Sequence, residues 1–531
     1  MASRFFDLVL NGPPPASSAS VPSTSTPSTL TRLPAELLSA IISNLCNRDI
    51  KNLRLTNTFF CDTAQLRLSR VFLSANPLNV ATYRKGITEI IWDEALLSES
   101  GHEHLRWGLG PEWVLRWFRK PCEEGLKMYT SGGSYEIETP ERAARVRQAR
   151  AHLAIEESWL HYQHLKRQEE DAIARGLDVE AFRYGLSRFP SLKRVTIIPA
   201  AHGRWLYMPL YETPMIRALP YGFSYLIPRG WPCAEGADNP PIPCPWEEHF
   251  LQNKWRGFRI VARELVRQKK HISEFVVDAH TLSTGLNCRV FDEPCEEYNN
   301  LVAIIQQPGF TRLQLDFTIG KQEHYGWHSF RSGLLRRALS KGVDLEDFRF
   351  GTNAEEGTGE GLMENHIPLL SIFPTDKWPR LKHFGLTRFL VTQADMISLL
   401  ASLPLTIRSV QLSFLYFLDG GGTWKTLLEE MRDTLGWRDR AEDARPAVSI
   451  GVDFITSEHR GRAIWADKEV HDFLYNDGET PFGWKGRNLN SVPDGKGIVR
   501  DAFDPQYERP HLSFRDYSPN SPPREKLVGL F

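Results

Sequence analysis

The sequence lacks an apolar run long enough to cross a membrane, and its seven cysteines include no Cys-x-x-Cys pair. A membrane-spanning helix needs roughly 20 consecutive apolar residues. Unpaired cysteines in an odd number are typical of a reducing compartment. The first residues, MASRFFDLVLNGPPP, have an acidic interruption at Asp7 and no cleavage pattern, so we expect no secretory signal. These absences predict a soluble protein of the cytoplasm or nucleus, with no membrane partner.

The chain also lacks an excess of charge of either sign. It carries 64 Lys and Arg residues against 65 Asp and Glu residues, which gives a formal net charge of −1. Without an overall positive field, the chain as a whole has no means of holding a polyanion by counterion release. Nucleic acid is therefore not expected as its main partner.

Motifs of catalysis and cofactor binding are missing. There is no Gly-x-Ser-x-Gly elbow and no dinucleotide fingerprint after a strand. His161 and His164 lie three apart on a predicted helix, but no further ligands complete a zinc site. The glycine-rich segment 351–365 has no closing Gly-Lys-Ser/Thr and contains glutamates that would repel an anion. Cys288 and Cys295 are interpreted as ordinary thiols. We predict a protein that is not an enzyme and that binds no metal and no cofactor.

What is present is the composition of a globular protein. The 531 residues are 41% apolar and 24% charged, which predicts more than one buried core. Residues 1–30 form a leader rich in Ser and Pro that has almost nothing to bury, and residues 511–531 share that bias. We expect both ends to be flexible and the folded body to lie between them.

The stretch LTRLPAELLSAIISNLCNRDIKNLRLTNTFFCD, residues 30 to 62, has the densest apolar pattern in the chain. Pro34 suits a first helical turn, and apolar residues then recur at three- and four-residue spacing as far as Leu45. Ile50 and Leu53 indicate a second short helix, and Phe59 begins the apolar side of a third. So small a unit lacks the interior volume to bury all these faces. Part of its surface is therefore expected to meet a partner or another domain.

The series Leu33-Pro34-x-Glu36-Leu37-Leu38-x-x-Ile41, with the later Leu45, Ile50, Leu53 and Phe59, closely resembles the F-box, and the continuation resembles F-box families of filamentous fungi. F-box proteins are substrate receptors of cullin–RING ubiquitin ligases, and the box binds the Skp adaptor. The resemblance implies a substrate-recognition subunit that reaches the cullin–RING ligase through Skp and holds a target protein of unknown identity. The residues it assigns to Skp contact are Leu33, Pro34, Leu37, Leu38, Ile41, Leu45, Ile50 and Leu53.

Three alternatives stay open. The segment from 31 to 70 could be a helical subdomain whose Leu and Ile residues form a local core, although the flexible leader argues that one face is free. The chain could be an F-box scaffold that acts outside the ligase. It could also be an enzyme whose dispersed site forms no motif.

The region after the box contains a further helical signal. Residues 139–176 begin with the capping pair Thr139 and Pro140, and Val146, Leu153 and Leu160 stand seven apart. This spacing predicts one long packing helix, too short in pattern for a coiled coil. The tryptophan-bearing loop 218–250 is interpreted as a buried staple rather than a recognition loop, because large aromatic side chains are mostly buried.

A short strand motif returns through the remainder of the chain. Each copy alternates apolar and other residues over a few positions, which is typical of a strand. The copies lie at 189–198, 272–279, 311–319, 345–351, 378–386 and 407–414. Helical patterns between them are predicted at 258–265, 327–334, 396–403 and 424–431.

The predicted fold is mixed α/β, with an N-terminal three-helix F-box followed by an irregular solenoid that resembles the degenerate leucine-rich-repeat body of many F-box proteins. An ordinary α/β domain with a compact sheet is the alternative. The predicted divisions are a leader at 1–30, the F-box at 31–75, a helical linker at 76–180, the repeat-like substrate-binding body at 181–510 and a tail at 511–531.

Overall fold

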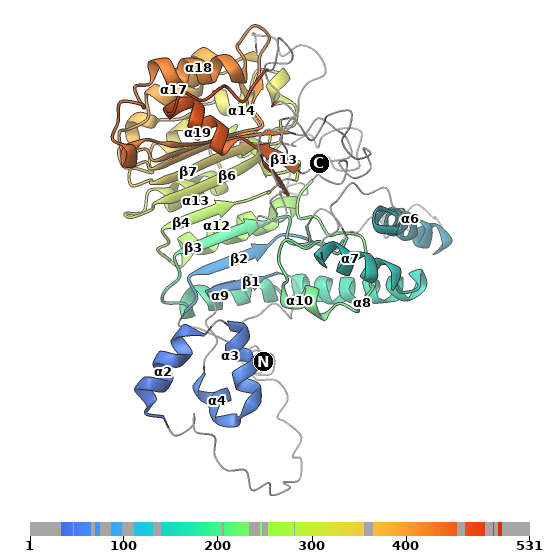
Figure 1. Ribbon diagram of the computed structural model, residues 1–531. Helices are drawn as coiled ribbons and strands as arrows, with labels where there is room; N and C mark the ends of the chain where they lie inside the picture. The colour runs from blue at the N-terminus through green and yellow to red at the C-terminus, as the bar shows by residue number, and fades with distance from the viewer. Residues whose placement is uncertain are drawn as a thin grey trace, which may run out of the picture.

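The structure is a computed structural model that describes residues 33–45, 47–64, 69–74, 86–97, 111–130, 140–203, 206–232, 245–246, 253–280, 282–354, 365–453, 462–483, 492 and 498–501. The predicted leader, the tail and most of the glycine-rich segment lie outside these residues. The described elements combine helices with one large sheet (Figure 1), so the prediction of a mixed α/β fold is confirmed. None of the described helices is both long and apolar enough to cross a bilayer.

The strands of the large sheet follow one another in chain order from β1 to β14, apart from β5, which pairs only with β6. Neighbours from β1 to β12 are parallel, and β13 and β14 are antiparallel. The strands are β1 (Arg70–Leu73), β2 (Glu89–Asp93), β3 (Arg194–Ile198), β4 (Glu274–Val277), β5 (Leu286–Asn287), β6 (Arg312–Thr318), β7 (Asp347–Thr352), β8 (His383–Thr387), β10 (Ser409–Ser413), β12 (Ala447–Asp453), β13 (Arg462–Trp465) and β14 (Ile498–Asp501); β9 (Leu390–Val391) pairs separately with β11 (Tyr416–Phe417).

All six strands expected from the sequence are confirmed. They are β3, β4, β6, β7, β8 and β10, and these six strands are consecutive neighbours in the sheet. The register pairs Phe275 with Leu313, Leu313 with Phe348, and Phe348 with Phe384, at similar intervals along the sequence. The next interval, from Phe384 to its partner Val410, is shorter. The fold therefore repeats a strand, a connection and the next strand, with connections of unequal length.

Alternate side chains of each strand form the core. Val195, Phe275, Leu313, Phe348 and Phe384 occupy one register row, and each is fully buried. A residue two positions further along each strand makes a second buried row. Because the period of a strand is two, both rows point to the same face, where helices cover them.

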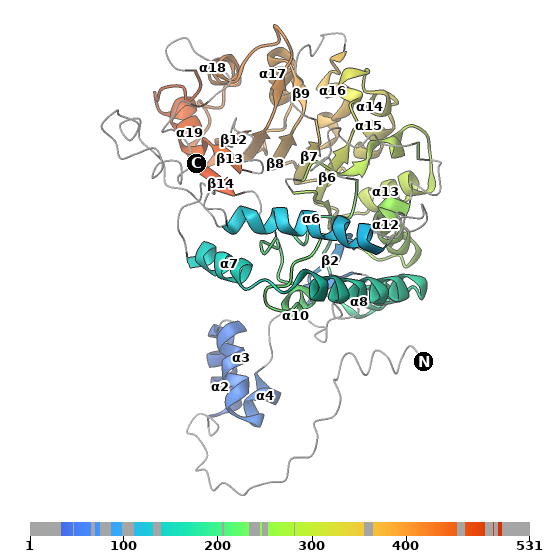
Figure 2. The same cartoon turned by 90° about the vertical axis from the view of Figure 1, so that its right-hand side faces the viewer.

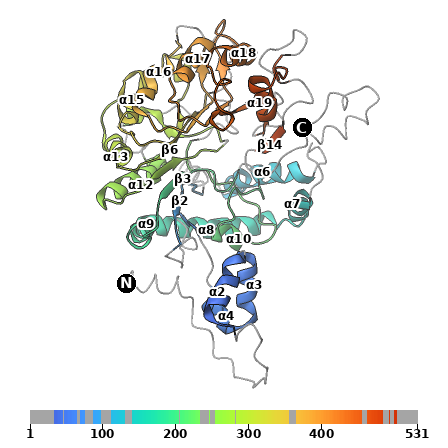
Figure 3. The same ribbon diagram turned by 60° about the vertical axis from the view of Figure 1, so that its left-hand side comes forward.

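Figures 2 and 3 show the helices along the outside of the curved sheet. They are α9 (Leu177–Arg188), α12 (Arg256–Arg267), α13 (Glu296–Ile305), α14 (His328–Arg331), α15 (Leu334–Leu339), α16 (Leu369–Ile372), α17 (Gln393–Ala401), α18 (Trp424–Thr434) and α19 (Asp467–Tyr475). The predicted helices at 258–265, 396–403 and 424–431 correspond to α12, α17 and α18. The one expected at 327–334 is two short helices, because Gly333 between them adopts a positive φ of 81°.

A second core lies beside the strand ends. It joins α6 (Pro111–Thr130), α7 (Pro140–Arg150), α8 (Ile155–Ala174) and the segment around α10 (Pro214–Ala218). The single helix expected over 139–176 is wrong, since the chain leaves the helical path between α7 and α8. There the N–H of Leu153 donates to the carbonyl of Gly222 at 3.0 Å instead of to a helical carbonyl. Leu160, the third residue of the seven-residue spacing, is 66% exposed.

Two strands of the sheet lie inside stretches that the sequence assigned to other divisions. β1 starts at Arg70, inside the stretch assigned to the F-box, and β2 lies inside the stretch assigned to a helical linker. Both strands belong to the same sheet as β3. Trp231 and Trp246 from the tryptophan-bearing loop are buried, which confirms the structural interpretation for these two side chains.

Candidate functional site

Three short helices form a separate unit at the N-terminal side of the body. They are α2 (Ala35–Asn44), α3 (Asn47–Thr56) and α4 (Thr58–Thr63), and their helical nature was predicted. Figures 1 and 3 show this unit beyond the end of the sheet formed by β1. The unit contains no strand in its described residues, and its helices α3 and α4 pack against each other.

Local hydrogen bonds set the limits of these helices. The carbonyl of Pro34 accepts the N–H of Leu38 at 3.0 Å, which makes Pro34 the entry to α2. Asn57 caps α4, because its side chain accepts the N–H of Phe59 at 2.9 Å. The Arg54 guanidinium donates to the carbonyl of Ala64 at 2.8 Å and ties the end of α4 to α3. The relative placement of α3 and α4 is therefore fixed by a polar contact as well as by packing.

The interior of the unit is small. Leu38, Ile50, Phe60 and Ala64 are each at most 3% exposed. The rings of Phe59 and Phe60 meet edge to face with centroids 5.4 Å apart. Each helix contributes one of these buried side chains, and Ala64 directly follows α4. A core of this size leaves other apolar side chains of the unit partly or largely in contact with solvent.

Four large apolar side chains of the unit are exposed. Leu37 is 54% exposed, Ile41 41%, Leu55 86% and Phe59 41%. Ten large apolar side chains are exposed in the part of the chain that the structure describes, and these four come from the one short stretch between Leu37 and Phe59. Leu37 and Ile41 are four residues apart on α2 and so share one face of that helix. An apolar face left in contact with water is the feature expected of a docking surface.

Burial divides the eight residues that the sequence assigned to Skp contact. Pro34, Leu37 and Ile41 are exposed. Leu33, Leu45 and Leu53 are half-buried. Leu38 and Ile50 are buried at 2% and 0% exposure, so they belong to the interior of the unit and stabilise its fold rather than its surface. Their burial favours an interior role for these two side chains, and the contact with Skp stays a prediction for all eight residues.

Leu55 and Phe59 were missing from the predicted contact set. Both residues belong to the pattern that resembles the F-box, where Leu55 ends the run Leu53-Arg54-Leu55. The periodicity gives no means to distinguish an exposed from a buried apolar position in so short a helix. The available signal was length, since α3 and α4 have 10 and 6 residues and cannot cover every apolar side chain.

Candidates for chemistry elsewhere in the body are explained by packing. His161 meets the ring of Phe223 edge to face, and His164 is exposed on α8. Burial raises the pKa of the Cys288 thiol to about 12 and that of Cys295 to about 11, which disfavours the reactive thiolate. Among the residues that the structure describes, no group of three His, Cys, Asp or Glu side chains is placed to hold a metal ion.

Buried carboxylates hold the segment that follows β2 against α12 and α8. Glu94, just after β2, accepts the N–H of Gly257 at 2.7 Å and the indole N–H of Trp92 at 2.8 Å. Glu169 on α8 accepts the N–H of Leu97 at 3.1 Å and a bond from Lys166 at 3.2 Å. Burial raises the pKa of both carboxyl groups to about 7, against the lowering effect of these hydrogen bonds. Their contacts are internal, so they hold elements together.

Comparison with models of known protein families gives no match, and no curated protein is significantly similar in sequence. The resemblance to the F-box therefore depends on the quoted residues, and the function of the chain is inferred from those residues and from the geometry of the N-terminal unit.

Proposed function

We propose that this protein is a substrate-recognition subunit of a cullin–RING ubiquitin ligase, with α2, α3 and α4 binding the Skp adaptor and the body binding a target protein. The observation that carries the proposal is the exposure of Leu37 and Ile41 on a unit whose interior is filled by Leu38 and Ile50. The unit keeps its own small core and leaves apolar surface for a second protein.

The body supports the second half of the proposal. Its parallel strands follow one another in chain order, with helices on the outer face, as expected of a degenerate leucine-rich-repeat solenoid. Such a scaffold offers a long surface to a macromolecule and needs no catalytic group. The subunit would act by proximity, since holding the target raises the effective concentration of its lysines near the conjugating enzyme.

Reconstitution tests the proposal. The full chain is mixed with purified Skp adaptor and cullin, and the complexes are separated by size-exclusion chromatography. We expect co-elution of all three with the natural chain and loss of both partners with a Leu37→Ser, Ile41→Ser double variant. Leu160→Ser is the matched control, because Leu160 is also exposed but lies on α8, outside the unit.

The same experiment separates the alternatives. Co-elution with Skp but not with cullin would support a scaffold that acts outside the ligase. Equal Skp recovery for the double variant and the control would contradict the assignment of these residues.

A further inference from the structure

The edge at which the parallel strands begin carries a strong local positive charge. Six segments precede strands β3, β4, β6, β7, β8 and β10, namely 188–193, 267–273, 306–311, 340–346, 376–382 and 402–408. Together they contain ten Lys and Arg residues and three Asp and Glu residues, a formal net charge of +7 in a chain whose total is −1. We call these segments the basic edge.

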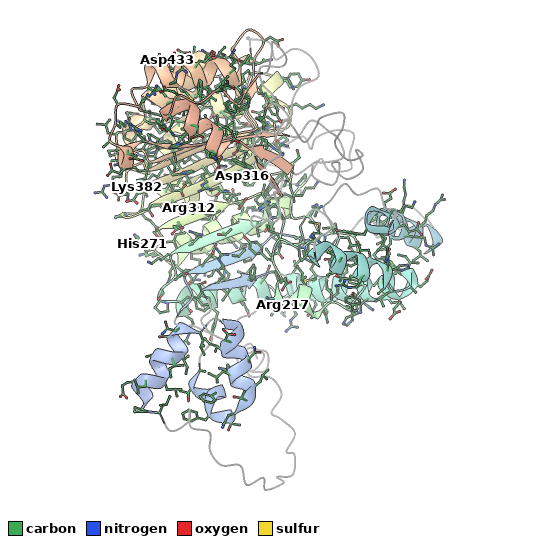
Figure 4. The ribbon with its side chains drawn as sticks, viewed as in Figure 1. Arg217, His271, Arg312, Asp316, Lys382 and Asp433 are labelled. Carbon is green, nitrogen blue, oxygen red and sulfur yellow. The ribbon has the colours of Figure 1, made fainter. Side chains whose placement is uncertain are left out.

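The segments are neighbours in space. The N–H of Ser273 donates to the carbonyl of Lys193, and the N–H of Arg408 donates to that of Lys382. Similar bonds connect each pair of adjacent segments. Figure 4 shows His271, Arg312 and Lys382 along this side of the sheet, with Asp316 further toward the strand ends. Six strands at about 4.8 Å spacing make the edge about 24 Å long.

The three acidic side chains of the edge are already paired within it. Asp344 lies 2.9 Å from Arg380, Glu346 lies 2.8 Å from Lys382, and Asp376 lies 3.0 Å from Lys377. The cations outside these three pairs are Arg188 and Lys193 before β3, Arg267, Lys269 and Lys270 before β4, Lys341 before β7 and Arg408 before β10. No acidic residue occurs in the segments before β3 and β4, so the positive charge is densest there.

The sheet face opposite the outer helices has a different charge pattern from that of the basic edge. Its first register row consists mainly of paired charges. Arg70 pairs with Glu89 at 2.6 Å, Arg194 pairs with Glu274, and Arg312 lies 3.6 Å from Asp347. Charges alternate across the strands in this row and largely cancel. On the edge, Arg267 lies 3.8 Å from Glu264, and the other six cations outside the three pairs leave a local excess of positive charge that the sheet as a whole does not share.

Exposed apolar residues run along the same edge. They lie four positions before the first residue of a strand, and they are Pro190, Pro308, Val343, Pro379 and Leu405. Val343 is 55% exposed and Leu405 81%. In these six segments, all of which the structure describes, every Phe and Trp side chain is buried, so none of these rings is available for stacking on nucleic-acid bases.

We infer that the basic edge binds an extended, acidic protein segment in which apolar side chains are interspersed. Lys and Arg complement the carboxylates of such a segment, and the exposed row accommodates its apolar side chains. An extended peptide of about seven residues spans the edge at roughly 3.3 Å per residue. The binding itself is independent of the Skp adaptor; only the identification of the segment as part of a ligase target rests on the proposed function.

Fluorescence anisotropy with the full chain tests this inference. The probe is a labelled eight-residue peptide that alternates glutamate and valine, with a peptide of glutamine and valine and a short duplex DNA as comparisons. We expect the glutamate peptide to bind most tightly, and its binding to weaken at high salt because exposed charges are screened.

A triple variant, Lys193→Gln, Lys269→Gln and Lys341→Gln, is expected to bind the glutamate peptide about tenfold or more weakly. The matched control carries the same substitution at Lys120, Lys254 and Lys468, which are exposed but lie on α6, just before α12 and on α19. Thermal unfolding checks that both variants fold. Equal peptide affinity of the two triple variants would overturn the inference, as would binding of the glutamine peptide or of the duplex at least as tight as that of the glutamate peptide.

Discussion

Gly257 allows helix α12 to approach the end of strand β2. Its N–H donates to Glu94, and a Cβ atom at this position would overlap the Glu94 carboxylate and the Trp92 indole. Because both neighbours are buried and hydrogen-bonded, they cannot move aside without losing their contacts. The absence of a side chain here is therefore a packing requirement.

We expect Gly257→Ala to lower the free energy of unfolding by about 1–3 kcal/mol through overpacking. Gly125→Ala is the control, since its Cβ would meet Leu206 at an ordinary 3.7 Å within helix α6, where alanine is favoured by about 0.5–1 kcal/mol. Denaturant unfolding of both variants measures the difference. Equal effects of the two substitutions would show that the close approach to Glu94 is not limiting.

At the scale of single residues, the sequence distinguishes apolar from polar positions better than buried from exposed ones. Leu37 and Leu38 are adjacent in the same apolar pattern, yet one is 54% exposed and the other 2%. Which of them faces inward depends on where α3 and α4 pack, and that depends on contacts between helices that the periodicity of one helix does not contain.

On the scale of elements, α2 has one side that supports the unit and another that faces solvent. Leu38→Ala should destabilise the three helices by about 2–5 kcal/mol, because it leaves a cavity in a core of few side chains. Leu37→Ala should change their stability little. Hydrogen exchange of the amides in α2, α3 and α4 measures both. Comparable loss of protection in the two variants would mean that Leu37 is also part of the core.

The joint between α8 and the sheet should respond to pH. Burial raises the pKa of Asp93, Glu94 and Glu169 from ordinary values near 4 to about 7. Between these values the folded state holds protons that the unfolded chain releases, so the contribution of these groups to stability is full below about pH 4 and is lost as the pH rises through 7.

The melting temperature is therefore expected to fall more gently from pH 5 to pH 8 in Glu169→Gln than in the natural chain. Glu170→Gln provides the control, because Glu170 is the next residue on α8 and is half exposed. If the two variants show the same pH dependence, the buried carboxylate does not contribute as proposed.

Elements were predicted well where alternation was regular and poorly where it was not. The six strands β3, β4, β6, β7, β8 and β10 alternate apolar with other residues or end in a pair of apolar residues. The sequence predicts all six. β2 is buried along its whole length, so it has no alternating pattern. β12 also alternates, through Val448, Ile450 and Val452, but was not among the predicted strands. The break between α7 and α8 depends on a bond from Leu153 to Gly222, which lies far away in the sequence.

At the scale of the whole molecule, a net charge of −1 conceals the segregation of charge. The basic edge emerges because the parallel register brings together segments that are far apart in the sequence, such as those that hold Lys193 and Lys269. The composition indicates that the chain as a whole has no positive field to hold a polyanion. That conclusion is compatible with a basic surface confined to one edge. The same folding leaves the three-helix unit at one end of the sheet, beyond β1.

The claim that a second subunit covers the exposed apolar side chains of α2 is tested most directly by calorimetric titration of the full chain with purified Skp adaptor at several temperatures. We predict saturable binding with a negative heat-capacity change, the mark of apolar burial, and its loss in the Leu37→Ser, Ile41→Ser variant but not in Leu160→Ser. Absence of binding by the natural chain, or undiminished binding by the double variant, would contradict the account.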